Sequence, residues 1–199
     1  MRLIAGTENL LNDLHINQWC FLDIGFSNNR RTCGLLIGND NPIKLTYSEA
    51  AKSIVCFAKM NENICLVIEA PLSVSFDKNG NPIGRKVEKE NGRTRYWYNS
   101  PGSTVLVSAL YLLHTLYNEK LHTKVHLFEG FVSFRSNKGR LSHLNDVVSL
   151  KKMVENYHRC KNTFFFYDSL CMTDTDSIQS LGKVAGFDFG VPPLIKVTD

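Results

Sequence analysis

Two acidic residues stand inside hydrophobic runs of the chain: Asp23 in WCFLDIGFS and Glu69 in ICLVIEAPLS. Burying a charge in such a run is costly unless the charge is paired or ligates a metal ion. Continuous apolar runs are typical of strands covered on both faces of a sheet, where the residues that do chemistry lie at the strand ends. Both acids therefore predict a functional site. The alternative is structural: each acid caps a helix or pairs with an arginine such as Arg30 or Arg31.

A histidine and a third acid lie at the start of an expected helix. His143 and Asp146, in SHLND, are spaced i to i+3, so both can face the same cleft. Alternatively, Ser142, Asn145 and Asp146 simply form a capped, acidic first turn. The other histidines show no metal-binding spacing such as H-E-x-x-H, and no G-x-S-x-G elbow surrounds Ser73.

Basic and aromatic residues alternate in one stretch of the chain. Residues 85–98 carry five basic groups and three aromatic ones, among them Arg93, Arg95 and Trp97. Basic groups can follow phosphates and aromatic faces can stack on bases, as in grooves for single-stranded nucleic acid. A solvated hairpin whose aromatic residues pack on the protein body explains the same composition. A second basic group, in FRSNKGR, is expected to contact substrate phosphate: Arg135, Lys138 and Arg140.

The composition is that of an ordinary globular domain. The 199 residues are 43% hydrophobic and 21% charged, and the net charge of +4 permits a polyanionic partner without demanding one. The six cysteines are scattered and show no C-x-x-C pair, which predicts free thiols. No run approaches the length of a membrane span, and the N-terminus lacks a signal-peptide pattern, so we expect a cytoplasmic protein with no membrane partner. The oligomeric state, including a homodimer, is left open.

The acids are positioned by an expected α/β sheet. Hydrophobic patterns predict helices that begin at Ser48, at Ser100 and at Ser142, and a short closing helix over DTDSIQSLGKVAG, residues 174–186. Strands are predicted at 19–27, 32–38 and 42–47, in the Glu69 run, at 124–134 and in NTFFFYDSL at 162–170. An opening three-strand meander followed by alternating helices and strands indicates a mixed sheet flanked by helices.

One segment departs from this composition. Residues 73–99 are polar, rich in turn residues and dense in charge. The segment is too long for a bare connection, so we expect an inserted, projecting β-hairpin that turns near Asn79-Gly80 or near Asn91-Gly92. Its basic and aromatic residues make it a candidate substrate arm.

The order of elements, with an aspartate in the first strand and an acid ending the fourth, resembles the ribonuclease H-like fold. The motifs DIGFS, VIEAPLS, HLFEGFVSFR and SHLNDVVSLKK, in this succession, resemble an uncharacterised family of predicted ribonuclease H-like nucleases. This resemblance covers most of the chain and implies a single ribonuclease H-like domain over residues 1–199, with a mixed sheet of five or more strands.

The resemblance also implies a site and an activity. Asp23, Glu69 and Glu129 fall where the family places acids, and the last acid is expected from the closing helix, as Asp176 or Asp174. Asp174 has an alternative role as a helix cap. Four such carboxylates would hold Mg²⁺ or Mn²⁺ for hydrolysis of a phosphodiester in DNA or RNA. His143 joins the substrate-binding candidates. The alternatives are a ribonuclease H-like module that binds nucleic acid or protein without cutting, and a small-molecule phosphohydrolase.

Overall fold

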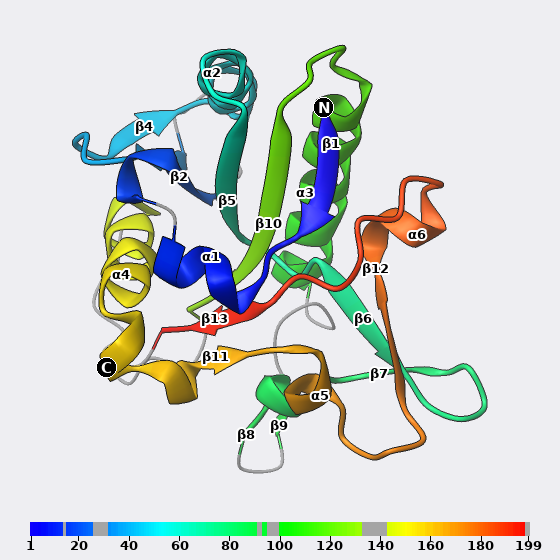
Figure 1. The fold of residues 1–199 in the computed structure, drawn as a ribbon. Helices are drawn as coiled ribbons and strands as arrows, with labels where there is room; N and C mark the ends of the chain where they lie inside the picture. The colour runs from blue at the N-terminus through cyan, green and yellow to red at the C-terminus, as the bar shows by residue number, and fades with distance from the viewer. Residues whose placement is uncertain (14, 26–31, 91–92, 95–99, 133–142, 198–199) are drawn as a thin grey trace.

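The computed structural model describes residues 1–13, 15–25, 32–90, 93–94, 100–132 and 143–197. Its main sheet has eight strands in the order β11-β13-β10-β5-β2-β3-β4, with β1 paired to β10 (Figure 1). The strands are β1 Arg2–Ala5, β2 Trp19–Asp23, β3 Cys33–Ile37, β4 Ile43–Leu45, β5 Asn63–Glu69, β10 Lys124–Phe131, β11 Phe164–Phe165 and β13 Leu194–Lys196. The predicted mixed α/β sheet is confirmed.

The centre of this sheet is parallel. β2, β5 and β10 run in the same direction, as do β1 and β13 beside β10, whereas β3 is antiparallel to both β2 and β4. Every residue of β5 from Ile64 to Ile68 is fully buried, which explains its uninterrupted apolar run. The C-terminal ends of β2 and β5, which carry the two acids, therefore lie at the same end of the sheet.

Helices cover both faces of the sheet. The helices are α1 Glu8–Asp13, α2 Tyr47–Lys59, α3 Ser100–Asn118, α4 His143–Glu155, α5 Tyr167–Leu170 and α6 Leu181–Val184. α2 and α3 pack on one face, in a core that includes Leu22 and Ile68. α1 and α4 pack on the opposite face, with Phe21 and Val67. Successive residues of a strand point to opposite faces, so these two cores identify the side on which each strand residue lies.

The helix boundaries follow local signals. Thr46 rather than the expected Ser48 caps α2: its hydroxyl accepts the Glu49 N–H while the Glu49 carboxylate accepts the Thr46 N–H, a capping box. The helices predicted from Ser100 and Ser142 correspond to α3 and α4. None of the helices in the described residues is both long and apolar enough to cross a membrane.

The chain adds a second, smaller sheet to the first. β6 Ser73–Phe76 pairs with β7 Pro82–Ile83 around a turn at residues 77–81, which contains the predicted Asn79-Gly80 pair and in which Gly80 has a φ of +79°. β12 Ser177–Ser180 pairs with the other edge of β6. A further pair, β8 Lys89–Glu90 with β9 Arg93–Thr94, flanks the second predicted turn, which lies outside the described residues.

The prediction of a closing helix over residues 174–186 is wrong. Residues 177–180 form strand β12, antiparallel to β6, and only α6 is helical. Ile178 is buried between exposed or half-exposed neighbours, a two-residue alternation that suits a strand. The predicted strand at 162–170 is also shorter, because β11 ends at Phe165 and α5 begins at Tyr167. Strands β1 and β13 were not predicted.

Candidate functional site

Asp23 and Glu69 lie directly opposite each other. They are register partners at the last positions of the adjacent parallel strands β2 and β5. Alternation along the strands puts both on the α4 face, with Phe21 and Val67 two residues before them. The register partner of Glu69 on the next strand, β10, is Gly130. Two carboxylates thus share one end and one face of the sheet.

The first residue of α4 completes this arrangement. His143 Nδ1 lies 2.8 Å from Asp23 Oδ2, and 42% of the histidine side chain is exposed against 4% of the aspartate side chain. The hydrogen bond to Asp23 raises the pKa of His143, with a further contribution from the negative charge of Asp146. The pair is thus an aspartate bonded to a histidine that is readily protonated.

Two glycines allow α4 to approach so closely. A Cβ on Gly34, the register partner of Asp23 on β3, would lie 2.3 Å from the His143 carbonyl oxygen. A Cβ on Gly25, two residues beyond Asp23, would lie 2.8 Å from His143 Nε2. Neither position tolerates a side chain without displacement of its neighbours. Gly25 in DIG and Gly34 in TCG are the sequence signal that could have indicated this contact.

Asp146 is the third acid of the site. It follows His143 by one turn of α4, and its negative charge acts on both Glu69 and His143. Burial raises the pKa of Glu69 well above its usual range, and the charges of Asp23 and Asp146 add to this effect, while the backbone N–H of Val132 donates to Glu69 and opposes it. Asp146 is not among the four carboxylates that the resemblance implies as metal ligands.

Glu129 belongs to a different cluster. It is the register partner of Ile68, so it points to the opposite face of the sheet from Glu69. Its side chain is fully buried, Oε1 lies 2.5 Å from Arg85 Nη2, and Oε2 accepts from Arg85 Nη1 and from the Leu72 N–H. Both oxygens therefore already have protein donors, and Glu129 does not join Asp23 and Glu69.

The remaining acids of the prediction lie elsewhere. Asp176 closes a turn: its Oδ2 accepts from the backbone N–H groups of Met172 and Thr173. The next residue, Ser177, pairs with Phe76 at the end of β6 that is farther from Glu69. Asp174 is exposed. The prediction that Asp174 and Asp176 lie close to Asp23 and Glu69 depended on a closing helix. The chain does not form that helix, so the fold gives no support to this placement.

The predicted substrate-binding residues are only partly described. Arg93 is in β9, and His143 is in the site itself. The other five lie outside the described residues: Arg95, Trp97, Arg135, Lys138 and Arg140.

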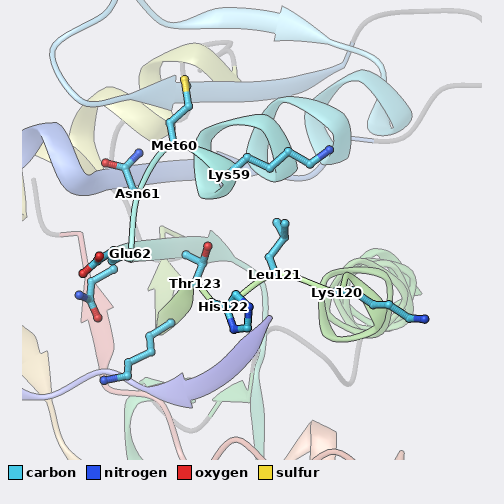
Figure 2. Close-up of a pocket in the computed structure, with 10 residues that line it drawn as sticks. Lys59, Met60, Asn61, Glu62, Lys120, Leu121, His122 and Thr123 are labelled. Carbon is cyan, nitrogen blue, oxygen red and sulfur yellow. The ribbon is translucent and has the colours of Figure 1, made fainter.

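A basic cavity lies far from the acids along the strands. Its volume is about 460 Å³, and its lining includes Lys59, Lys120, His122 and Lys124 (Figure 2). Asn63 and Lys124, which also line it, are the first residues of β5 and β10, whereas the acids end those strands. We call Asp23, Glu69, His143 and Asp146 together the acid site. The cavity and the acid site are therefore at opposite ends of the sheet.

The donors of the acid site have the chemistry that hard divalent cations prefer, since Asp23, Glu69 and Asp146 offer carboxylate oxygens. Within the described residues, neither Asp23 nor Glu69 forms an ion pair with a lysine or arginine. In the same part of the chain, however, no three His, Cys, Asp or Glu side chains converge closely enough to hold a metal ion. Asp23 Oδ2 is instead engaged by His143, so metal binding would require side chains to rearrange.

Comparison of the chain with protein-family models, with curated proteins and with solved structures finds no match.

Proposed function

We propose that this protein is a metal-dependent nuclease with a ribonuclease H-like fold. The observation that carries the proposal is the in-register pair of Asp23 and Glu69 at the ends of two central parallel strands, with His143 and Asp146 brought to it by α4. Burial, and after it the charges of Asp23 and Asp146, raise the pKa of Glu69, and acids with such raised pKa values gather at functional sites.

The order of elements supports the fold assignment. The succession β2-β3-β4-α2-β5-α3-β10 is strand-strand-strand-helix-strand-helix-strand, with Asp23 ending the first strand and Glu69 ending the fourth. This is the order on which the resemblance to ribonuclease H-like nucleases rests. The last acid of the site is assigned to Asp146 on α4 instead of Asp176, and Glu129 is left out of the ligand set.

The chemistry assigns a role to each residue. Asp23, Glu69 and Asp146 would hold Mg²⁺ or Mn²⁺, which supplies positive charge to the phosphate undergoing hydrolysis. Such a cation would relieve the repulsion between Asp23 and Glu69, and this gain in free energy would favour its binding. His143 orients the Asp23 carboxylate through the hydrogen bond from its ring.

The substrate is proposed to be DNA or RNA. Residues 133–142, which include Arg135, Lys138 and Arg140, connect the end of β10 to the start of α4. Gly130 on β10 and His143 on α4, described residues on either side of this segment in the chain, both border the acid pair. Lysine and arginine contacts to phosphate are the usual source of nucleic-acid affinity.

Cleavage of a labelled panel of single-stranded, duplex, hybrid and branched nucleic acids with Mg²⁺ or Mn²⁺ tests the proposal. We expect Asp23→Asn, Glu69→Gln and Asp146→Asn each to lower the rate by about 100-fold or more. Asp176→Asn is the matched control, because its carboxylate closes a remote turn. Equal activity of the wild type and all three site variants would contradict the proposal.

A non-catalytic module that binds nucleic acid or protein is the second candidate. It is favoured by one observation: the described side chains do not form a three-residue metal site. Thermal unfolding with and without Mn²⁺ separates the two, since a metal enzyme gains stability from its cation and a metal-free module does not. Cytoplasmic location stays a prediction, and the oligomeric state stays open.

A further inference from the structure

A second group of charged and polar side chains, which we call the Arg85 cluster, includes Glu129 and so reaches the face of the sheet opposite to the acid site. It consists of Ser73, Arg85, Glu88 and Glu129, all fully buried. Arg85 Nη2 lies 2.6 Å from Glu88 Oε1 and 2.5 Å from Glu129 Oε1, and Arg85 Nη1 donates to Glu129 Oε2 at 2.7 Å and to Ser73 Oγ at 2.9 Å. One guanidinium therefore joins three separate parts of the chain.

Burying the charged groups of this cluster costs free energy of desolvation. Burial opposes the charge of Arg85, but Glu129 and Glu88 raise its pKa, so the guanidinium stays protonated. Burial also raises the pKa of Glu129, despite the opposing effect of Arg85. Apolar side chains of similar volume are often at least as stabilising as buried ion pairs. A role in specifying geometry is therefore a better explanation of this cluster than a role in stability alone.

The cluster reaches Glu69 through the backbone. Glu129 Oε2 accepts the Leu72 N–H at 2.8 Å, which ties down the turn that follows Glu69. The residue after Glu129 is Gly130, the register partner of Glu69. A Cβ on Gly130 would lie 3.4 Å from the Glu69 Cα, so the two backbones are in close contact. Glu129 thus restrains Glu69 in two ways. It precedes Gly130, the residue of β10 that pairs with Glu69, and it binds the backbone of residues 70–72, which follow Glu69.

The same cluster reaches the β8–β9 hairpin. Glu88 Oε2 accepts the Arg85 N–H at 2.9 Å, and Glu88 Oε1 accepts from Arg85 Nε and Nη2. Lys89, the next residue, is the first of β8. The base of the hairpin is therefore bonded to the same arginine that holds Glu129.

We propose that Arg85 and Glu88 are positioning residues that hold Glu69 in place, through Glu129 on β10 and the Leu72 amide. This inference rests on the proposed nuclease function. It assigns a fixed, buried role to Arg85 and Glu88, which differs from the projecting substrate arm expected of the 73–99 segment.

Two variants and one control test the connection. Arg85→Lys keeps the buried charge but loses the forked donor, and Glu88→Gln is isosteric and milder if the first variant is poorly folded. Lys86→Met is the control, because Lys86 is the exposed neighbour of Arg85. Hydrogen exchange of the Leu72 amide is measured on the protein without metal or substrate, together with the Phe21 amide in β2 as an internal reference.

We expect exchange at Leu72 to become about tenfold faster in Arg85→Lys or Glu88→Gln and to be unchanged in Lys86→Met and at Phe21. With the cleaved nucleic acid as substrate, we expect kcat to fall about tenfold while KM stays within about twofold, because Glu69 is misplaced and binding surfaces are kept. Unchanged exchange at Leu72 would overturn the inference. If the wild type cleaves nothing, the nuclease proposal fails, and exchange at Leu72 still decides the positioning role.

Discussion

Asp23 and Glu69 are register partners on β2 and β5, and both point to the face covered by α4. Adjacent strands lie about 4.8 Å apart, so two carboxylates at these positions repel each other strongly when both are ionised. The raised pKa of Glu69 is the consequence of its burial and of this proximity. The acid pair is therefore a destabilising element in the metal-free protein.

Neutralising Glu69 should accordingly stabilise the protein. We expect Glu69→Gln to raise the Tm at neutral pH without divalent metal, by about 2–4 °C for each kcal/mol of repulsion removed. Added Mn²⁺ should stabilise the wild type and leave the variant nearly unchanged. Differential scanning calorimetry checks both effects, with Asp176→Asn as the control that shows neither. A lower Tm for Glu69→Gln would mean that the carboxylate is structural.

The pH dependence of stability should show the same sign for Glu69 and His143. Each has a folded-state pKa above its unfolded value, so each binds more protons in the folded state and stability falls as the pH rises through that window. For His143 the window begins near pH 6.5, its unfolded pKa. The hydrogen bond to Asp23 and the charge of Asp146 raise the pKa of His143, while Lys44 and burial lower it.

Chemical denaturation of the metal-free protein between about pH 6 and pH 9 measures how much the free energy of unfolding declines as the pH rises. We expect His143→Gln and Asp23→Asn each to flatten the decline, by less than about 1 kcal/mol because solvent screens the partly exposed histidine. An unchanged pH profile in both variants would contradict a charged His143–Asp23 pair.

A side chain at Gly34 should disturb the site without removing any of its functional groups. In Gly34→Ala the new Cβ would meet the His143 carbonyl oxygen at 2.3 Å, so the start of α4 must move away from Asp23. We expect destabilisation by about 1–3 kcal/mol and loss of most activity. Lys44→Ala is the control, since Lys44 is the exposed register partner of Gly34 on β4. Wild-type activity in Gly34→Ala would refute the role of this close approach.

Truncating Glu129 should have the opposite sign to neutralising Glu69. Glu129→Ala leaves Arg85 with one carboxylate fewer in a fully buried position, for which we expect a loss of about 3–5 kcal/mol. Urea denaturation measures it. Asp176→Ala, whose carboxylate bonds only exposed turn amides, should lose about 1 kcal/mol or less. A gain of stability in Glu129→Ala would instead identify Glu129 as an unpaired site acid.

Reversing basic charges should show which end of the sheet binds nucleic acid. Replacing Arg135, Lys138 and Arg140 with glutamate should weaken nucleic-acid binding and reduce the slope of log K against log salt by up to about 3. Replacing Lys59 and Lys120 of the basic cavity (Figure 2) should change neither quantity, because that cavity lies at the other end of β5 and β10. Fluorescence anisotropy over a salt series measures both, and an effect confined to the cavity variants would move the binding surface to that end.

The sequence alone was sufficient for the two acids and for the main order of elements. Asp23 and Glu69 end apolar runs, and a charge at the end of a buried strand is visible without knowledge of any partner. The long helices and central strands were also predictable, because hydrophobic periodicity is a local property. β1 and β13 were missed because each has only three or four residues and depends on pairing with β10.

Tertiary structure decided the rest of the candidate site. Glu129 points away from Glu69 because the register of β10 makes Gly130, not Glu129, the partner of Glu69, and a shift of one residue reverses the face. Residues 177–180 are a strand because pairing with β6 overrides their local pattern. His143 and Asp146 reach the acids because Gly34 lets α4 dock there. Strand register, pairing and close packing depend on residues distant in sequence, so local patterns do not determine them.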